Sequence, residues 1–317
     1  MTNSFRATTM SSTLHSPRRE HVLGDSQMGE LAALGSAACW ALASIAFTSL
    51  ATSVDVVAAN AFRCLVASLF FAALLPFAGG LDALRGLTPA VVGILAVSVT
   101  MIIGIGDTLF FKAMRTIGVS RAMPIAGANP LITTGLAVAF LGERLTVFQT
   151  AGVIVTMAGL LLIVSPDRRR TVVVQPSSAT GIVLAVLTAL AWGVGTALLK
   201  TGLSNVGPVV VNSVRQPAAL AFLIGLMVLR GQRLDSYRRL DRRGWVLLLV
   251  TSLLSSGLGS LLFVTGLQLA GAARGSVLSS TAPLFSVPLS VVVLHERASV
   301  RVIAGTLLTV VGIGLVM

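Results

Sequence analysis

The sequence contains few charged residues for its length. Of its 317 residues only 11% are charged, whereas 55% are hydrophobic. A typical soluble protein has about a quarter of its residues charged, and a water-soluble fold has no interior large enough to hide this much apolar surface. The composition therefore excludes an ordinary soluble domain and favours a membrane protein.

Cysteine and histidine are also scarce. The only cysteines, Cys39 and Cys64, lie inside apolar runs, which excludes a disulfide framework and gives no metal-ligand spacing. The three histidines lie outside those runs. The sequence lacks a His-Glu-x-x-His zinc motif, a Gly-x-Ser-x-Gly elbow and a phosphate-binding Gly-Lys-Ser/Thr loop. We therefore expect no metal, no cofactor, no enzymatic activity and no ATP-driven pump.

The net charge of +12 does not indicate a nucleic-acid partner. Nearly all lysines and arginines lie in short breaks between apolar runs, such as Arg168 to Arg170 and the arginine-rich stretch 230–243. Such breaks are typical of loops between membrane spans. Lipid is the partner that this pattern predicts.

The apolar runs predict an all-α membrane protein with ten transmembrane helices, because a helix needs about 20 apolar residues to cross the hydrocarbon core. The predicted spans are residues 31–51, 56–78, 88–111, 122–141, 146–165, 180–199, 207–229, 244–270, 275–294 and 302–317. Residues 1–29 have no apolar periodicity and are predicted to be a disordered tail. Residues 166–179 are predicted to link two five-helix halves, 31–165 and 180–317.

An internal repeat supports this division into halves. A shift of 152 residues (192 − 40) aligns Trp40 with Trp192, Asn60 with Asn212 and Arg63 with Arg215. A shift of 153 aligns later pairs, among them Gly104 with Gly257, Gly106 with Gly259, Phe110 with Phe263, Pro130 with Pro283, Glu143 with Glu296, Gly152 with Gly305 and Gly159 with Gly312. Because each half has an odd number of spans, the halves are predicted to be inverted repeats, a plan that recurs in secondary transporters.

These residues resemble the EamA-type transporters of the drug/metabolite transporter superfamily. Each half has a Trp in its first span, an Arg in its second, a Pro in its fourth, and an acidic turn after the fourth, Leu-Gly-Glu-Arg-Leu at 141–145 and Leu-His-Glu-Arg-Ala at 294–298. The resemblance implies ten helices and transport of small metabolites or drugs. It also implies an N-terminus inside the cell, whereas the distribution of basic residues places it outside. The orientation stays open.

Three ionisable residues fall well inside predicted spans: Arg63, Asp107 and Arg215. A charge at the bilayer centre is costly, so such residues usually face a cavity or a partner. Asp107 has Ser260 as its repeat partner and is therefore a candidate for proton coupling or for binding a cationic substrate. The alternatives are a fixed ion pair of Asp107 with Arg63 or Lys112, and arginines that reach the interface or bind backbone carbonyls.

Further polar and aromatic residues are candidates for the substrate pathway. Asn60 and Asn212 lie three residues before the arginines and share their helix face. Asn129-Pro130 and Pro283 interrupt their helices and are predicted to bend them or to expose polar backbone. Trp40 and Trp192 lie deep in their spans and are predicted to pack inside or to form an aromatic wall.

Two other sets of repeated residues are predicted to be structural. The glycines 152, 159, 305 and 312 are spaced for close helix contact, within the chain or in a homodimer. Glu143 and Glu296 are predicted to cap the helices that follow them, the fifth and the tenth.

The sequence therefore predicts a gradient-driven transporter of a small solute in the cytoplasmic membrane, working by alternating access, with export as the favoured direction. A facilitative or uptake carrier is the first alternative. A membrane-embedded enzyme and a membrane scaffold are the others.

Overall fold

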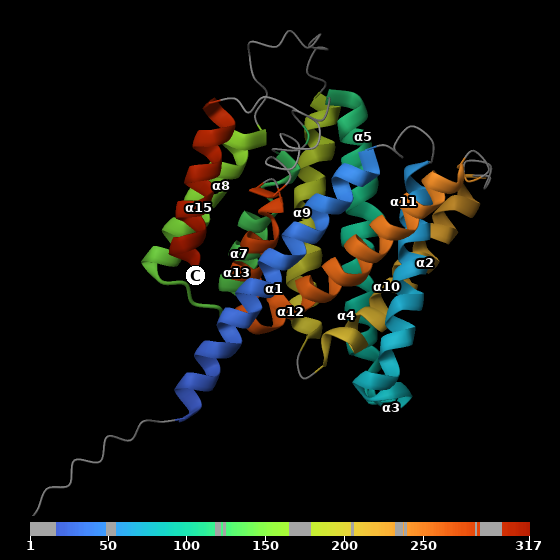
Figure 1. The fold of residues 1–317 in the computed structure, drawn as a ribbon, viewed down its shortest axis with the longest axis horizontal. Coiled ribbons are helices and arrows are strands. Elements are labelled where there is room, and N and C mark those ends of the chain that lie inside the picture. The colour runs from blue at the N-terminus through green and yellow to red at the C-terminus, as the bar shows by residue number, and fades with distance from the viewer. Residues whose placement is uncertain are drawn as a thin grey trace, which may run out of the picture.

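The chain folds almost entirely into helices (Figure 1). The structure is a computed structural model and describes residues 17–48, 55–117, 122, 125–164, 179–203, 206–231, 237, 240–282, 284–285 and 300–317. Within these ranges no strand occurs. The all-α fold class is thus confirmed for the described residues.

The elements of the two halves follow one another in corresponding order. The first half contains α1 (Pro17–Thr48), α2 (Val56–Leu74), η1 (Leu75–Ala78), α3 (Gly80–Arg85), α4 (Pro89–Val99), η2 (Thr100–Asp107), α5 (Thr108–Ile117), α7 (Asn129–Phe140) and α8 (Val147–Val164). The second half contains α9 (Ala179–Gly202), α10 (Pro208–Leu229), α11 (Arg242–Ser252), η4 (Leu253–Gly259), α12 (Ser260–Ala270), α13 (Ala272–Ser279) and α15 (Val300–Val316).

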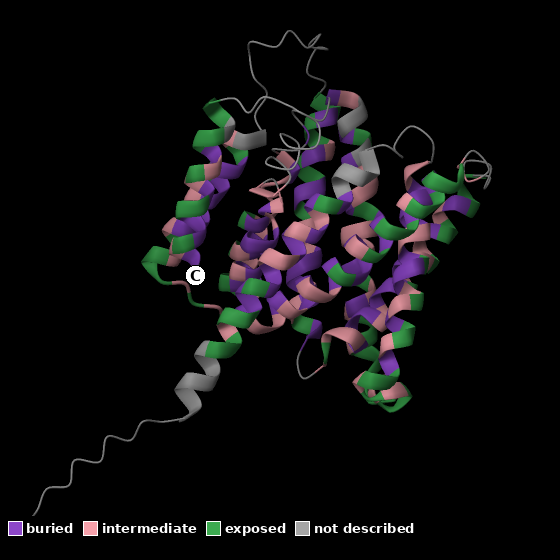
Figure 2. Ribbon diagram, viewed as in Figure 1, coloured by how far each residue is buried: buried purple, intermediate pink, exposed green. Residues whose placement is uncertain are grey.

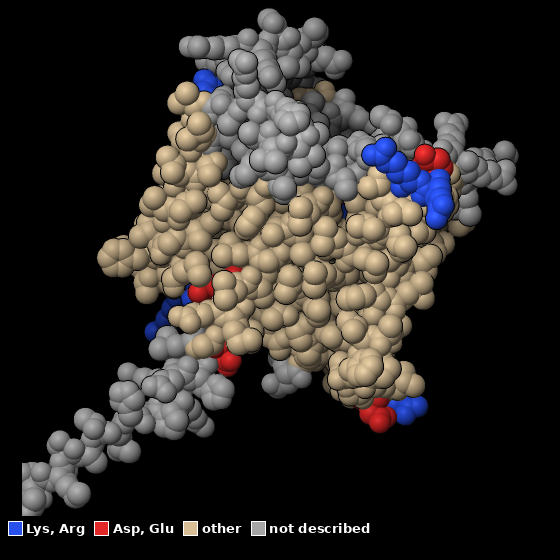
Figure 3. Space-filling view, viewed as in Figure 1, with Lys and Arg blue, Asp and Glu red and all other residues tan. Residues whose placement is uncertain are grey.

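Five continuous helical segments in the described ranges are long and apolar enough to cross a membrane, and three shorter apolar helices accompany them. The long segments are Val56–Ala78, Pro89–Phe110, Ala179–Gly202, Pro208–Leu229 and Arg242–Ala270. Their outer surfaces are apolar: Leu69, Val97 and Val228 are all exposed, and Figure 2 shows exposed positions along the outer sides of the bundle. Figure 3 shows that charged side chains gather toward the two ends of the face in view, as a membrane protein requires.

Two predicted boundaries differ from the structure. Residues 1–29 were predicted to be a disordered tail, but α1 already begins at Pro17. The part of this helix around Gly29 packs closely against Leu269, because a Cβ at Gly29 would lie 2.6 Å from Leu269 Cβ. The predicted span 122–141 is also interrupted, because turn residues 127–128 precede α7. With 12 residues, α7 is about 18 Å long at 1.5 Å per residue, which is too short to cross the core alone.

Each third span contains a π-helical segment at the same place in the repeat. These segments are η2 and η4, and they carry the paired glycines 104 and 106 and 257 and 259. A π-helical turn is rare, occurs often at functional sites and widens the backbone locally. η2 ends at Asp107, and η4 is followed directly by Ser260.

The two halves pack against each other through pairs of equivalent contacts, one made by each half. A Cβ at Gly106 of η2 would meet the ring of Trp192 in α9, and a Cβ at Gly259 of η4 would meet the ring of Trp40 in α1. Glycine is therefore required at both places for close approach. Each half's first helix thus lies against the other half's third span, an arrangement that binds the halves into one bundle.

The last helices of the two halves, α8 and α15, also make equivalent contacts with each other and lie side by side in Figure 1. A Cβ at Gly159 of α8 would lie 2.7 Å from Gly305 O, and a Cβ at Gly312 of α15 would lie 2.8 Å from Thr156 Cα. The predicted role of these glycines in close helix packing is confirmed, and the contact lies within the chain.

An aromatic cluster surrounds Tyr237, which lies between α10 and α11 in the sequence. The Tyr237 ring stacks on Trp245 at a centroid distance of 5.9 Å, and Phe62 lies 5.5 Å from Trp245. The Tyr237 hydroxyl donates to Ala58 O at 2.6 Å. Burial and the nearby Asp55 raise the pKa of Tyr237 to about 12, so the hydroxyl keeps this proton at physiological pH.

We predict that Gly312→Leu destabilises the α8–α15 pair, because the added side chain would overlap the backbone of Thr156. Overpacking of this kind costs about 1 to 3 kcal/mol. The matched control is Gly314→Leu on the same helix, where a Cβ would meet nothing within 4 Å. Thermal unfolding in detergent should show a lower midpoint for Gly312→Leu only. Equal midpoints for the two variants would contradict the assigned contact.

Candidate functional site

The three charged residues predicted inside the spans lie around one thiol. Cys64 of α2 is 1% exposed and interacts electrostatically with Arg63, Asp107 and Arg215. These residues come from α2, η2 and α10, so both halves contribute. We call Arg63, Cys64, Asp107 and Arg215, together with the amides and hydroxyls bonded to them, the core cluster.

In the first half, the core cluster pairs opposite charges. Arg63 Nη1 donates to Asn60 Oδ1 at 2.9 Å, which confirms that the amide and the arginine share one face. Asp107 interacts electrostatically with Arg63 and accepts a hydrogen bond from Trp192 Nε1 at 3.1 Å. Lys112, the other predicted partner of Asp107, has an exposed side chain. The negative charge of Asp107 is thus balanced by Arg63.

In the second half, neutral polar groups stand at the positions equivalent to Asp107 and Cys64. Asn212 Oδ1 accepts a hydrogen bond from Ser260 Oγ at 2.8 Å and a longer one from Arg215 Nη1 at 3.4 Å. Gln216 occupies the place of Cys64 in the repeat, and its Nε2 donates to Ser260 Oγ at 3.2 Å. Asn212, Arg215 and Gln216 are all buried.

Two polar atoms of this second part have no hydrogen-bond partner among the residues that the structure describes. They are Arg215 Nε and Gln216 Oε1, both of which are buried. A buried polar atom without a partner is costly and calls for an explanation. Sequence reasoning did not identify Gln216 or Ser260 as site residues, although the shift that aligns Arg63 with Arg215 also places Gln216 in this position.

The two tryptophans hold the π-helical segments from the opposite half. Trp192 Nε1 donates to Ile102 O at 3.1 Å, and Trp40 Nε1 donates to Ser255 O at 3.2 Å. These carbonyls correspond in the repeat, since 255 − 102 is 153. Interior packing, rather than anchoring at headgroups, was the prediction, and both rings are only partly exposed.

The interruption at Pro130 is stabilised locally. Pro130 lies in the first turn of α7, where no N–H is required. Its missing N–H would leave Ala126 O without a helical donor, and Asn129 Nδ2 donates to that carbonyl at 3.2 Å. The carbonyl therefore has a hydrogen-bond donor within the chain. Pro283 lies outside the described residues, but a proline that was not singled out, Pro217, lies inside α10 beside the core cluster.

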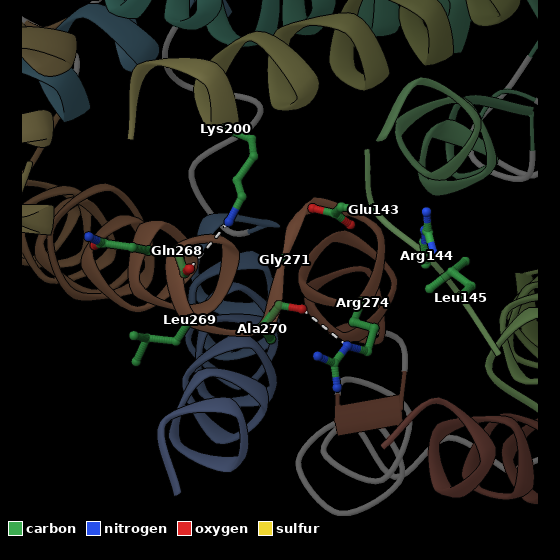
Figure 4. Close-up of a pocket in the computed structure, with 9 residues that line it drawn as sticks. All are labelled: Glu143, Arg144, Leu145, Lys200, Gln268, Leu269, Ala270, Gly271 and Arg274. Carbon is green, nitrogen blue, oxygen red and sulfur yellow. Dashed lines mark hydrogen bonds between the residues drawn. The ribbon is translucent and has the colours of Figure 1, made fainter. Parts of the chain in front are cut away.

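A second polar region lies near one end of the bundle, away from the core cluster. Its open groove is shown in Figure 4 and is lined by Glu143, Arg144, Leu145, Lys200, Gln268, Leu269, Ala270, Gly271 and Arg274. Glu143 accepts hydrogen bonds from Ala272 N at 2.6 Å and Ala273 N at 3.0 Å, at the start of α13. It therefore connects the end of the first half to the second half.

Two further contacts lie beside the groove, one within the second half and one between the halves. Lys200 Nζ of α9 donates to Leu267 O at 2.8 Å, near the end of α12. Arg274 of α13 forms a 2.7 Å ion pair with Glu30 of α1, whose side chain is 3% exposed. Gly271 turns the chain between α12 and α13 with a φ of 89°, a conformation that favours glycine.

Glu143 was predicted to cap the helix that follows it, and this prediction was wrong. Glu143 caps α13 of the other half, whereas α8, the helix that follows it, is capped by Thr146. Gln149 N donates to Thr146 Oγ1 at 3.2 Å, and Thr146 N donates to Gln149 Oε1 at 3.0 Å, which is a reciprocal capping box. Glu296 lies outside the described residues.

We predict that Glu143→Ala lowers stability by about 1 kcal/mol, the usual contribution of a helix N-cap. Glu143→Gln should lose less, because an amide oxygen still accepts a hydrogen bond. Arg144→Gln, an exposed neighbour, serves as the control. Thermal unfolding midpoints in detergent test the order, and a loss in Arg144→Gln equal to that in Glu143→Ala would refute the cap.

Comparison with known proteins agrees with this architecture. The sequence matches the EamA-like transporter family twice, over residues 27–165 and 179–317. A protein of Archaeoglobus fulgidus described as an uncharacterized transporter is 25% identical over 294 residues, which are 90% of this chain and 97% of that protein. The uncharacterized transporter YvbV of Bacillus subtilis is 26% identical over 219 residues, which are 66% of this chain and 68% of YvbV.

A solved crystal structure has the same fold. It superposes with a TM-score of 0.76 at 20% sequence identity and covers 92% of this chain and 97% of its own. Both repeats match the family, their apolar helices form one bundle, and relatives over most of the chain are named as transporters. The chain is therefore a multi-pass membrane protein that belongs to the EamA-like transporter family.

Proposed function

We propose that this chain is a secondary transporter that exports a small metabolite or drug across the cytoplasmic membrane by alternating access. In this proposal ten spans form two inverted five-helix repeats, with the solute site between them. Facilitative or uptake transport would use the same site with a different driving force or direction.

The observation that carries the proposal is the position of the core cluster. Its charged residues lie on α2, η2 and α10, in segments long and apolar enough to span the membrane. Charged groups at such depth are typical of substrate and ion pathways. Because α2 belongs to one half and α10 to the other, a movement of one half against the other would change access to the cluster.

The reciprocal contacts support the inverted arrangement. Trp40 contacts the second half as Trp192 contacts the first, and Gly257 approaches Phe70 of α2 as Gly104 approaches Phe222 of α10. Such an exchange is what a two-fold axis between the halves would produce. With five spans in each half, an axis of this kind lies in the membrane plane.

The contacts of Glu143 are suited to closing one side of the bundle. They consist of two hydrogen bonds beside an open groove, and the Arg274–Glu30 ion pair is a further contact between the halves at this end. These polar contacts would have to break for the halves to separate there. We propose that this end opens and closes during transport.

Flux through reconstituted protein tests the proposal. Proteoliposomes would be loaded with a panel of small metabolites and followed with and without a pH gradient, alongside empty liposomes. Gradient-driven flux of at least one solute is the expected result. Catalytic turnover without flux would favour a membrane-embedded enzyme, and inactivity in both assays would favour a scaffold.

We predict that Asp107→Asn abolishes the response of transport to a pH gradient, because the amide cannot exchange a proton between the two access states. Asp82→Asn is the matched control, since Asp82 forms an exposed ion pair with Arg85 at 3.2 Å. Initial rates are compared at several gradients. Coupling that persists unchanged in Asp107→Asn would rule out this carboxylate as the proton carrier.

A further inference from the structure

The charge of the core cluster is not balanced. Arg63, Asp107 and Arg215 all interact electrostatically with Cys64, so the ionised groups around this thiol sum to +1 (two arginines and one aspartate). Asp107 interacts electrostatically with Arg63. In the part of the chain that the structure describes, no carboxylate forms an ion pair with Arg215. A buried charge without a counter-charge is strongly unfavourable.

Arg215 is also poorly provided with hydrogen bonds. Its side chain is 3% exposed, and a guanidinium carries five N–H donors. Nη1 reaches Asn212 Oδ1 only at 3.4 Å, and that oxygen already accepts a shorter bond from Ser260 Oγ at 2.8 Å. Nε has no hydrogen-bond partner in the described part of the chain. The guanidinium therefore retains donors that point to an acceptor from outside the fold.

The repeat shows that this imbalance belongs to the second half alone. Ser260 occupies the position that Asp107 holds in the first half, and Gln216 occupies that of Cys64. Arg63 thus has a carboxylate across the helix interface, whereas Arg215 has a hydroxyl and an amide. The fold supplies an anion for one arginine and not for the other.

We propose that Arg215 binds the carboxylate of the transported solute, and that the substrates are small organic acids carrying one negative charge. This inference rests on the proposed transport function. A carboxylate accepts two parallel N–H bonds from a guanidinium. One negative charge would neutralise the core cluster, whereas a doubly charged phosphate would leave it negative.

The reaction rate of the Cys64 thiol tests this site even before a substrate has been identified. In a Cys39→Ala background Cys64 is the sole cysteine. Two methanethiosulfonates serve as probes, the anionic 2-sulfonatoethyl reagent and the cationic 2-(trimethylammonio)ethyl reagent. In both reactions the thiolate forms a mixed disulfide and methanesulfinate leaves. Each rate is divided by that reagent's rate with free 2-mercaptoethanol in the same buffer.

We expect the anionic reagent to be favoured roughly tenfold after this correction, as a cleft of one charge sign concentrates its counter-ion. Arg215→Gln should reduce the ratio to about one, since the cluster then carries no net charge. Arg215→Lys should retain the preference, and Asp107→Asn should increase it. Arg85→Gln, at an exposed ion pair, should change nothing.

The outcomes separate the two proposals. Modification of Cys64 by both reagents without an anion preference, or with a cation preference, would overturn the carboxylate site and leave transport intact. If neither reagent modifies Cys64 in membranes, alternating access is overturned and the carboxylate site with it. If Arg215→Gln does not fold, protection of Cys64 by propionate but not by propionamide, at equal ionic strength, still supports the site, and equal protection contradicts it.

Discussion

A polar group that lies within the membrane must find its partner inside the bundle or in a bound solute, because the hydrocarbon offers none. This constraint explains why the core cluster lies where α2, η2 and α10 meet, and why its amides are bonded to neighbouring helices. Asn212 Oδ1 of α10 accepts from Ser260 Oγ of α12 at 2.8 Å, and Gln216 Nε2 of α10 donates to the same hydroxyl at 3.2 Å. It also explains the exchange of tryptophans, since each indole N–H needs an acceptor that only the opposite half provides.

The halves share a scaffold but differ in chemistry. The glycines, tryptophans and π-helical segments correspond closely, and they determine how near the helices approach. The polar residues of the core cluster have diverged. Ser260 stands at the position equivalent to Asp107, and Gln216 stands at the position equivalent to Cys64. A symmetric frame lets the two halves exchange contacts, while asymmetric side chains give one bound solute a preferred orientation between them.

The sequence predicted the helical class and the repeat, and it singled out the charged residues of the core cluster, because apolar length and rare coincidences are local signals. It did not predict which residues touch. The shift of 152 identifies Trp40 and Trp192 as equivalents, but only the folded chain shows that each contacts the other half. Glu143 was assigned to the nearest helix for the same reason, although Thr146 and Gln149 already satisfy that helix.

The boundaries of α7 show a second reason for failure. The run 122–141 contains no charged residue, and hydropathy alone favours one continuous span. Pro130 lacks an N–H, however, and Asn129 offers its amide to the carbonyl of Ala126 in place of a helical bond. This local exchange makes an interruption inexpensive, so the helix restarts at Asn129. Hydropathy carries no information on such an exchange.

Pro217 introduces a difference between the two arginines that the repeat conceals. It lies inside α10 and cannot donate to Ser213 O, so the hydrogen-bond ladder is broken one turn around Arg215. The equivalent position in α2 is Leu65, which keeps its N–H. Helices bend at such breaks, and a bend here would move Arg215 while the ends of α10 stay packed. Of the two arginines of the core cluster, the one without a carboxylate is thus also the one beside a break in its helix.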